Sequence, residues 1–215
     1  MNSATDTRPV LIIGGGGHAK VVVSVLRVMG VRMLGAVDSD PGKHGGALLG
    51  VGILGDDEAV AGYAPAEVRL ANGIGSVRLT GRRTDVFDRF AGRGYRFVTL
   101  AHPSAVIAEG VTLGEGCQIM AGAVLQPEVS IGRNVIVNTG ATVDHDCAIG
   151  DHVHIAPGAT LSGGIVIGAG THIGAGATVV QGIAIGHRCL VRAGAVVIDD
   201  VPDGAMVAGI PARAA

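Results

Sequence analysis

The chain has almost no aromatic side chains, at 2% of its residues, and it has no Trp. Large rings are therefore too few to supply most of the core, although 48% of the 215 residues are hydrophobic. Burial must come from Val, Ile, Leu and Ala, which stack in thin, repetitive layers. An excess of either sign of charge is also missing. The net charge is −2, which gives no electrostatic footprint for nucleic acid or an anionic membrane.

Long apolar runs are missing too. The first ten residues, MNSATDTRPV, have no basic region followed by an apolar stretch, and no segment reaches the length that spans a bilayer. The sequence thus predicts a soluble cytoplasmic protein.

The chain does contain a strict sixfold repeat of aliphatic residues. Neither a helix nor an alternating strand places apolar residues six apart, whereas a hexapeptide repeat predicts a parallel β-helix in which each repeat forms one wall. The sixteen positions are Ile107, Leu113, Ile119, Leu125, Ile131, Val137, Val143, Ile149, Ile155, Leu161, Ile167, Ile173, Val179, Ile185, Val191 and Val197.

The three cysteines fit this repeat. Cys117, Cys147 and Cys189 each precede a hexad aliphatic residue by two positions. An odd count argues against a disulfide framework, and Ala or Val occupies most equivalent positions. We therefore predict buried, unreactive thiols that serve as small hydrophobic groups.

Residues 8–100 follow a different pattern, in which short strands alternate with helical segments, as in a parallel α/β domain. The segment is long enough for only half of a doubly wound fold. Because His102-Pro103 interrupts the pattern, we predict an α/β domain at 1–102 and a hexad domain at 103–215. The predicted strands are Val10–Ile13, Met33–Val37, Val51–Leu54, Val68–Ala71 and Phe97–Leu100, and the predicted helices are Ala19–Met29 and Ser76–Phe90.

A glycine loop joins the first strand to the first helix, and Asp38 ends the next strand. Backbone N–H groups at a helix N-terminus bind anions, and glycine lets a phosphate approach closely. A tight turn without a ligand, a nicotinamide dinucleotide and a sugar nucleotide all fit this pattern. Because a dinucleotide needs a second mononucleotide half, we favour the sugar nucleotide, with Asp38 on the ribose or base and His18 near the phosphates. The loop comprises Gly14, Gly15, Gly16 and Gly17.

The hexad region contains a histidine between two acids, Asp144-His145-Asp146. An imidazole beside a carboxylate is a general-base arrangement, because the carboxylate favours one tautomer and stabilises the imidazolium. A surface role for His145 is the alternative. His154 and His172 are eighteen residues apart, which predicts that they stack in one column. The spacing demands no metal site, and no metal is predicted.

The hexads and the ending VPDGAMVAGIPAR resemble the hexapeptide-repeat acyltransferases. This resemblance implies a left-handed parallel β-helix, usually trimeric, with acetyl-CoA bound between neighbouring coils. The segments GGGGHAK and LAHPSAVIAEG, together with Asp38, are similar to the sugar-nucleotide acetyltransferases of the bacillosamine, perosamine and sialic-acid pathways.

Within that family, TVDHDC matches the segment of the catalytic base, which implies His145 as base and Asp146 as its partner. GDHVHIAPGA matches the segment whose second histidine contacts the thioester region of acetyl-CoA, hence His154. Asn72 and Gly73, with Ser76, fall where the family builds the far side of the nucleotide pocket.

The function predicted from the sequence is N-acetylation, by acetyl-CoA, of a 4-amino-4,6-dideoxy sugar on a nucleoside diphosphate, with GDP-perosamine slightly favoured. Transfer is direct, because no nucleophile-elbow motif is present. Backbone N–H groups near Gly163 and Gly164 are expected at the acetyl group, where they could stabilise the oxyanion. Two alternatives stay open: O-acetylation of a sialic-acid type of sugar, and a non-enzymatic trimeric scaffold that senses a sugar nucleotide.

Overall fold

A computed structural model of the protein describes residues 6–77 and 80–215. Contacts divide the chain into two compact units. The first comprises residues 1–75 and 85–100, and the second comprises 76–84 and 101–215. The short segment 76–84 thus belongs with the hexads, although it lies within the α/β part of the sequence.

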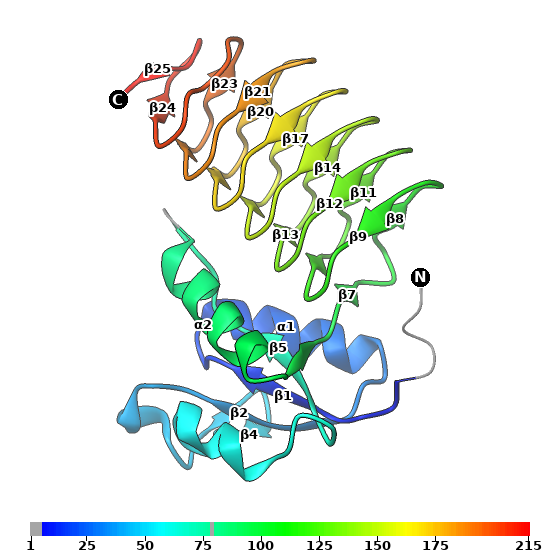
Figure 1. The fold of residues 1–215 in the computed structure, drawn as a ribbon, viewed down its shortest axis with the longest axis vertical. Coiled ribbons are helices and arrows are strands. Elements are labelled where there is room, and N and C mark those ends of the chain that lie inside the picture. Colours follow the sequence, from blue (N-terminus) through cyan, green and yellow to red (C-terminus); the bar gives the residue numbers. More distant parts are fainter. Residues whose placement is uncertain (1–5, 78–79) are drawn as a thin grey trace. The chain divides into compact units, whose positions relative to one another are not determined.

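The first unit contains a four-stranded parallel sheet in the order β2-β1-β5-β6 (Figure 1). Strand alternation places Leu11 and Ile13 in a core with Phe87 and Phe90. This is half of a doubly wound fold, as the sequence predicted. The strands of the sheet are β1 (Val10–Ile13), β2 (Met33–Val37), β5 (Arg69–Asn72) and β6 (Arg96–Phe97).

Helix α1 covers Gly17–Val28 and buries Val22, Val23 and Leu26. It begins two residues before the predicted start, because Gly17 is already helical, whereas Gly16 is the N-cap and has an extended backbone. Between β2 and β5 the chain forms η1 (Pro41–Lys43), β3 (Ala47–Leu48), β4 (Val51–Gly52) and η2 (Asp57–Gly62).

The predicted helix Ser76–Phe90 was wrong at its N-terminal end. Helix α2 covers Gly81–Gly92, and residues 78 and 79 of the predicted segment lie outside the described residues. The hydroxyls of Ser76 and Thr80 are used in contacts with the hexad region. Tertiary contacts therefore override helix propensity in this segment.

The second unit is the left-handed parallel β-helix expected from the hexads, with about six turns between residues 100 and 207. Its strands stack into three sheets, called here the first, second and third faces, and successive turns follow one another in Figure 1 from β8 to β24. Paired residues are eighteen apart, as in Ile119↔Val137 and Val137↔Ile155. One turn therefore consists of three hexads.

The strand bounds are as follows. The first face contains β7 (Leu100–Ala101), β10 (Gln118–Ile119), β13 (Ile136–Val137), β16 (His154–Ile155), β19 (His172–Ile173), β22 (Leu190–Val191), β24 (Met206–Ala208) and the antiparallel β25 (Arg213–Ala214). The second face contains β8 (Val106–Ile107), β11 (Val124–Leu125), β14 (Thr142–Val143), β17 (Thr160–Leu161), β20 (Thr178–Val179) and β23 (Val196–Val197). The third face contains β9 (Thr112–Leu113), β12 (Ser130–Ile131), β15 (Ala148–Ile149), β18 (Val166–Ile167) and β21 (Ala184–Ile185).

The hexad aliphatic side chains point into the coil and form one continuous core. Cys117, Cys147 and Cys189 are buried in that core as free thiols, which confirms their predicted placement. Burial raises the pKa of the Cys117 thiol to about 11. The residue before each aliphatic position points outward instead, so the three faces can be compared position by position.

Candidate active site

His145 lies at the corner between the second and third faces, in the turn after β14. Its Nδ1 is 2.7 Å from Oδ2 of Asp146, and its backbone N–H donates to Oδ1 of Asp144 at 2.8 Å. Asp146 has a φ of 61°, in the left-handed region that aspartate tolerates better than most residues. This turn directs the carboxylate back onto the neighbouring imidazole.

The electrostatics of this corner favour a protonatable imidazole. The hydrogen bond to Asp146 raises the pKa of His145, and the charge of Asp144 adds to the effect. About half of the side-chain surface of His145 is exposed, at 52%. An exposed histidine whose Nδ1 is occupied presents Nε2 as the atom that exchanges a proton with a substrate.

Gly163, one turn further along the coil, lies directly against this imidazole. A Cβ on Gly163 would be 2.6 Å from both Cε1 and Nε2 of His145. Gly164 is also close, because its N–H donates to the carbonyl oxygen of His145 at 2.8 Å. The structure therefore brings His145, Asp146, Gly163 and Gly164 together at one corner.

His154 and His172 form the predicted column on the first face. They pair between β16 and β19, and their ring centroids are 4.8 Å apart in a T-shaped arrangement. Both are only 4% exposed. Burial lowers the pKa of His172 to about 4, so this imidazole is neutral at pH 7.

Two residues lie beside this column although the sequence analysis did not place them there. Asn138 places Nδ2 3.1 Å from Nε2 of His154, and Ser76 places Oγ 2.7 Å from Nδ1 of the same ring. Ser76 was expected at the far side of the nucleotide pocket, whereas its hydroxyl contacts the histidine column. Because 78 residues separate Ser76 from His154, no local pattern could have predicted the contact.

The glycine loop lies at the carboxyl end of the parallel sheet in the first unit. Gly14 has a φ of 99°, and the N–H of Gly15 donates to Oδ2 of Asp38 at 2.6 Å. No atom would contact a Cβ at Gly16 or Gly17, so the start of α1 has open space above it. An anion has room to approach the backbone there.

Asp38 is largely buried, and its carboxylate already has several partners. Oδ1 accepts from the N–H of Asp40 at 2.9 Å, and Lys43 Nζ lies 3.0 Å from Oδ2. Burial opposes ionisation, but hydrogen bonds from Asp40, Lys43 and Gly15 outweigh it and lower the pKa of Asp38. The carboxylate is thus charged and holds the glycine loop.

Asn72 is the last residue of β5 and pairs with Ile13 at the end of β1, and Gly73 follows it. Asn72 is 1% exposed, and its Oδ1 accepts from the N–H of Ile74 at 3.1 Å. A Cβ on Gly73 would be 2.8 Å from Cβ of Ala19, so only glycine fits between the two segments. The structure thus gathers Gly14–Gly17, Asp38, Asn72 and Gly73 at one edge of the sheet, where the carboxyl ends of β1, β2 and β5 lie side by side.

His18 belongs to the same edge. A Cβ on Gly75 would lie 3.0 Å from Cβ of His18, so the segment after β5 passes beside the first turn of α1. The nucleotide-binding residues expected from the sequence are therefore neighbours within the first unit.

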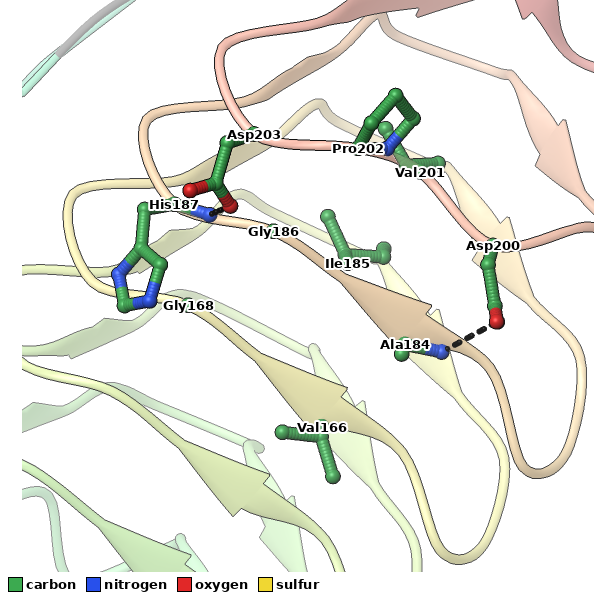
Figure 2. Close-up of a pocket in the computed structure, with 10 residues that line it drawn as sticks. All are labelled: Val166, Gly168, Ala184, Ile185, Gly186, His187, Asp200, Val201, Pro202 and Asp203. Atoms are coloured by element: carbon green, nitrogen blue, oxygen red, sulfur yellow. Dashed lines mark hydrogen bonds between the residues drawn. The ribbon is translucent and has the colours of Figure 1, made fainter.

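A groove of about 440 Å³ lies on the third face, near the C-terminal end of the coil. Figure 2 shows Val166, Ala184, Val201 and Pro202 along its apolar part, with His187 at one end. Asp200 and Asp203 cap backbone N–H groups, of Ala184 and His187 respectively. The carboxylates therefore stabilise the last turns of the coil.

Within the described ranges 6–77 and 80–215, no group of three His, Cys, Asp or Glu residues could hold a metal ion. None of the described helices is long and apolar enough to cross a membrane.

Family models match most of the chain. The PglD N-terminal domain matches residues 9–88, the bacterial transferase hexapeptide (six repeats) matches 128–163, and the hexapeptide repeat of succinyl-transferase matches 104–127 and 164–198. A variant of perosamine N-acetyltransferase from Caulobacter crescentus, in complex with CoA and GDP-perosamine, is 39% identical with a TM-score of 0.90, and 96% of each chain is covered.

The chain belongs to the hexapeptide-repeat sugar-nucleotide acetyltransferases. Membership makes it an enzyme that uses acetyl-CoA. Two further members are similar over most of their length. The acetyltransferase domain of PglB from Neisseria gonorrhoeae, in complex with acetyl coenzyme A, is 35% identical with a TM-score of 0.89, covering 97% of this chain and 99% of that one. WeeI from Acinetobacter baumannii is 27% identical with a TM-score of 0.88, covering 97% and 100%. No curated protein matches the chain.

Proposed function

We propose that this acetyltransferase N-acetylates the 4-amino group of a 4-amino-4,6-dideoxy sugar carried on a nucleoside diphosphate. The observation that carries the proposal is the imidazole–carboxylate pair, in which His145 Nδ1 is 2.7 Å from Asp146 Oδ2 on an exposed corner. Support for the acceptor comes from the glycine-loop unit and from the bound GDP-perosamine of the Caulobacter enzyme.

The proposed chemistry is a direct transfer. The sugar amine attacks the thioester carbonyl as a free base, forming the N–C bond, and His145 Nε2 accepts its proton. Collapse of the tetrahedral intermediate breaks the C–S bond, and the proton on His145 passes to the departing CoA sulfur. Asp146 keeps Nδ1 occupied and stabilises the imidazolium throughout.

The donor would lie at the corner that holds His145, with its acetyl group beside Gly163, Gly164 and, from another chain, His154. The N–H of Gly164 is already bonded to the carbonyl of His145. We therefore assign oxyanion stabilisation to the backbone at Gly163 and a space-making role to Gly164. Absence of a side chain at Gly163 leaves Nε2 of His145 open to the substrates.

We propose a homotrimer on the following geometry. In a three-sided coil, the corner that carries His145 is opposite the first face that carries His154, and the packed core separates them. One chain alone therefore cannot hold a thioester against both histidines. A neighbouring chain supplies the second histidine if each copy turns its corner toward the first face of the next.

The outward residues of the coil support this packing. On the second face they are Val106, Val124, Thr142, Thr160, Thr178 and Val196, exposed or half-buried and without charge. A ring of identical head-to-tail interfaces would bury such a surface and close on itself.

The trimer has a direct test by subunit mixing. His145→Asn and His154→Asn chains should each be nearly inactive alone. When the two variants are mixed in equal amounts and assemble at random, roughly three quarters of the trimers contain both. Each of these has one site of three in which both histidines are intact, so about one quarter of the wild-type activity should return. No recovery in mixed trimers, verified by mass, would exclude a site shared between chains.

The acceptor is proposed to bind the domain at residues 1–102, and the donor the domain at 103–215. Gly14–Gly17 and His18 would face the diphosphate, while Asp38, Asn72 and Gly73 would face the nucleoside. Guanine is the proposed base, on the strength of the GDP-perosamine bound by the Caulobacter enzyme. The proposed location is the cytoplasm, where acetyl-CoA and nucleotide-linked sugars are both made.

The decisive experiment follows release of the CoA thiol with GDP-, UDP- and dTDP-linked 4-amino sugars and with free sialic acid. We expect turnover with a nucleotide-linked amine, and GDP-perosamine to be the best acceptor. Turnover with sialic acid alone would establish O-acetylation instead. Binding of a nucleotide sugar without any acetyl transfer would indicate a sensing scaffold and overturn the proposal.

A further inference from the structure

Ser76 lies at the centre of a hydrogen-bonded chain that links the two histidines of the first face. Its Oγ is 2.7 Å from Nδ1 of His154 and 3.2 Å from Nδ1 of His172. We propose that Ser76 is a positioning residue that holds His154 in one orientation and one tautomer, with the proton on Nδ1. The inference rests on the proposed function in one respect only, the placement of His154 beside acetyl-CoA.

Asn138, at one end of this series of hydrogen bonds, determines the direction in which each bond is donated. The Oδ1 of Asn138 accepts from the N–H of Thr139 at 2.8 Å, which fixes the orientation of the amide. Its Nδ2 therefore faces His154 Nε2, at 3.1 Å. An amide nitrogen is only a donor, so Nε2 must accept, and the proton of neutral His154 is on Nδ1.

The remaining hydrogen bonds follow from that assignment. Nδ1–H of His154 donates to Oγ of Ser76, and the Ser76 hydroxyl donates to Nδ1 of His172. This direction requires an unprotonated Nδ1 on His172, and burial, which lowers the pKa of His172 to about 4, keeps that ring neutral. The three hydrogen bonds of the series Asn138–His154–Ser76–His172 then have mutually consistent directions.

The assignment has a chemical consequence for the donor site. With its proton on Nδ1 and its Nε2 lone pair accepting from Asn138, His154 cannot donate a hydrogen bond from Nε2 to a thioester oxygen. The same ring, turned over or in the other tautomer, would present an N–H group at that position and could donate to the thioester oxygen. Ser76 therefore selects what His154 offers to a bound acetyl group.

Ser76 is also close in sequence to residues that are proposed to bind the sugar nucleotide. It follows the Asn72-Gly73 pair by only three residues, yet it belongs to the coil unit by its contacts. A second contact anchors the same segment, since the Thr80 hydroxyl donates to the carbonyl of Gly170 at 3.1 Å. Thr80 touches neither histidine through this bond, so it supplies a matched control.

The first test is long-range 1H–15N NMR of the histidine rings in the wild-type protein, with His172→Asn used for assignment. We expect Nδ1 of His154 to carry the proton and Nε2 to show the shift of an unprotonated nitrogen. A proton on Nε2 would overturn the proposal. This measurement needs no substrate and no variant at Ser76, so it decides the question even if Ser76→Ala fails to fold.

The second test uses kinetics. Ser76→Ala removes the acceptor of a buried N–H, so the single tautomer should be lost and kcat should fall about tenfold, with little change in KM for the nucleotide sugar. Ser76→Thr, which keeps the hydroxyl, should restore kcat, and Thr80→Ala should lower it much less. An equal loss in Thr80→Ala, or an unchanged His154 spectrum in Ser76→Ala, would show that the segment only docks on the coil.

The two proposals fail in different ways. If the wild-type protein transfers acetyl groups to none of the amino sugars, the proposed function fails, but the spectrum of His154 still decides the role of Ser76. If transfer occurs and His154 carries its proton on Nε2, the proposed function stands and the role of Ser76 is wrong.

Discussion

The coil carries two histidine sites that differ in almost every physical respect. His145 is exposed on a corner between charged neighbours, and its pKa is raised. His154 and His172 are buried on a face, are bonded to neutral groups, and His172 has a lowered pKa. One residue type thus provides a proton acceptor at one site and a fixed neutral hydrogen-bonding group at the other, because the first site is exposed at a corner and the second is buried beside Ser76.

The strongest way to break this comparison is to remove the imidazole at the corner. His145→Asn should lower kcat by roughly 10²- to 10⁴-fold, the usual contribution of a general base. The fold and the melting temperature should change little, because the side chain is exposed. The measurement is CoA release under saturating substrates, with acetyl-CoA binding by calorimetry as the control. Full activity in this variant would remove His145 from the mechanism.

The buried histidine His172 should instead affect how the free energy of unfolding depends on pH. The pKa of His172 is about 4 in the folded protein and about 6.5 in an unfolded chain, so the unfolded state binds more protons between these values. The free energy of unfolding should therefore fall as the pH drops through this window, by up to about 3 kcal/mol.

A matched variant isolates this effect. Ile136 and Leu190 occupy the same column as His172, which makes His172→Leu a suitable apolar replacement. Urea unfolding at pH 7, 5.5 and 4.5 should show a weaker pH dependence in this variant than in the wild type. The same dependence in both proteins would show that His172 does not titrate with a lowered pKa.

Asp146→Asn tests whether the carboxylate at the corner causes the raised pKa of His145. Because Asp146 raises the pKa of His145, its loss should move the acid limb of kcat/KM toward lower pH. The plateau rate should fall roughly tenfold, since the imidazolium loses a charge-assisted hydrogen bond. A pH–rate profile over pH 5–9 measures both effects. An acid limb that moves to higher pH would contradict the assigned pair.

The smallest expected effect concerns the cysteines. Burial raises the thiol pKa of Cys117 and of Cys147, and all three thiols lie in the core. No thiol should react with a disulfide reagent in the native protein, and all three should react after denaturation. Reaction of a native thiol would show that the core opens locally.

The hexads predicted the coil, its buried cysteines and the stacking of His154 on His172, because a strict period converts spacing into position. The glycine loop and Asp38 were predictable for a similar reason, since adjacent parallel strands end at one edge. The sequence could not predict the start of α2, because Ser76 and Thr80 are held by distant parts of the coil. Asn138 and Ser76 at the histidine column were missed for the same reason.

The spacing of the turns has one more consequence. The ring centroids of His154 and His172 are 4.8 Å apart, which is the distance between neighbouring strands of a sheet. Each turn of the coil thus moves an equivalent residue along the coil axis by one strand spacing. An insertion or deletion of eighteen residues would move every later group by one strand spacing and leave it on the same face, whereas one of six or twelve residues would move it to a different face.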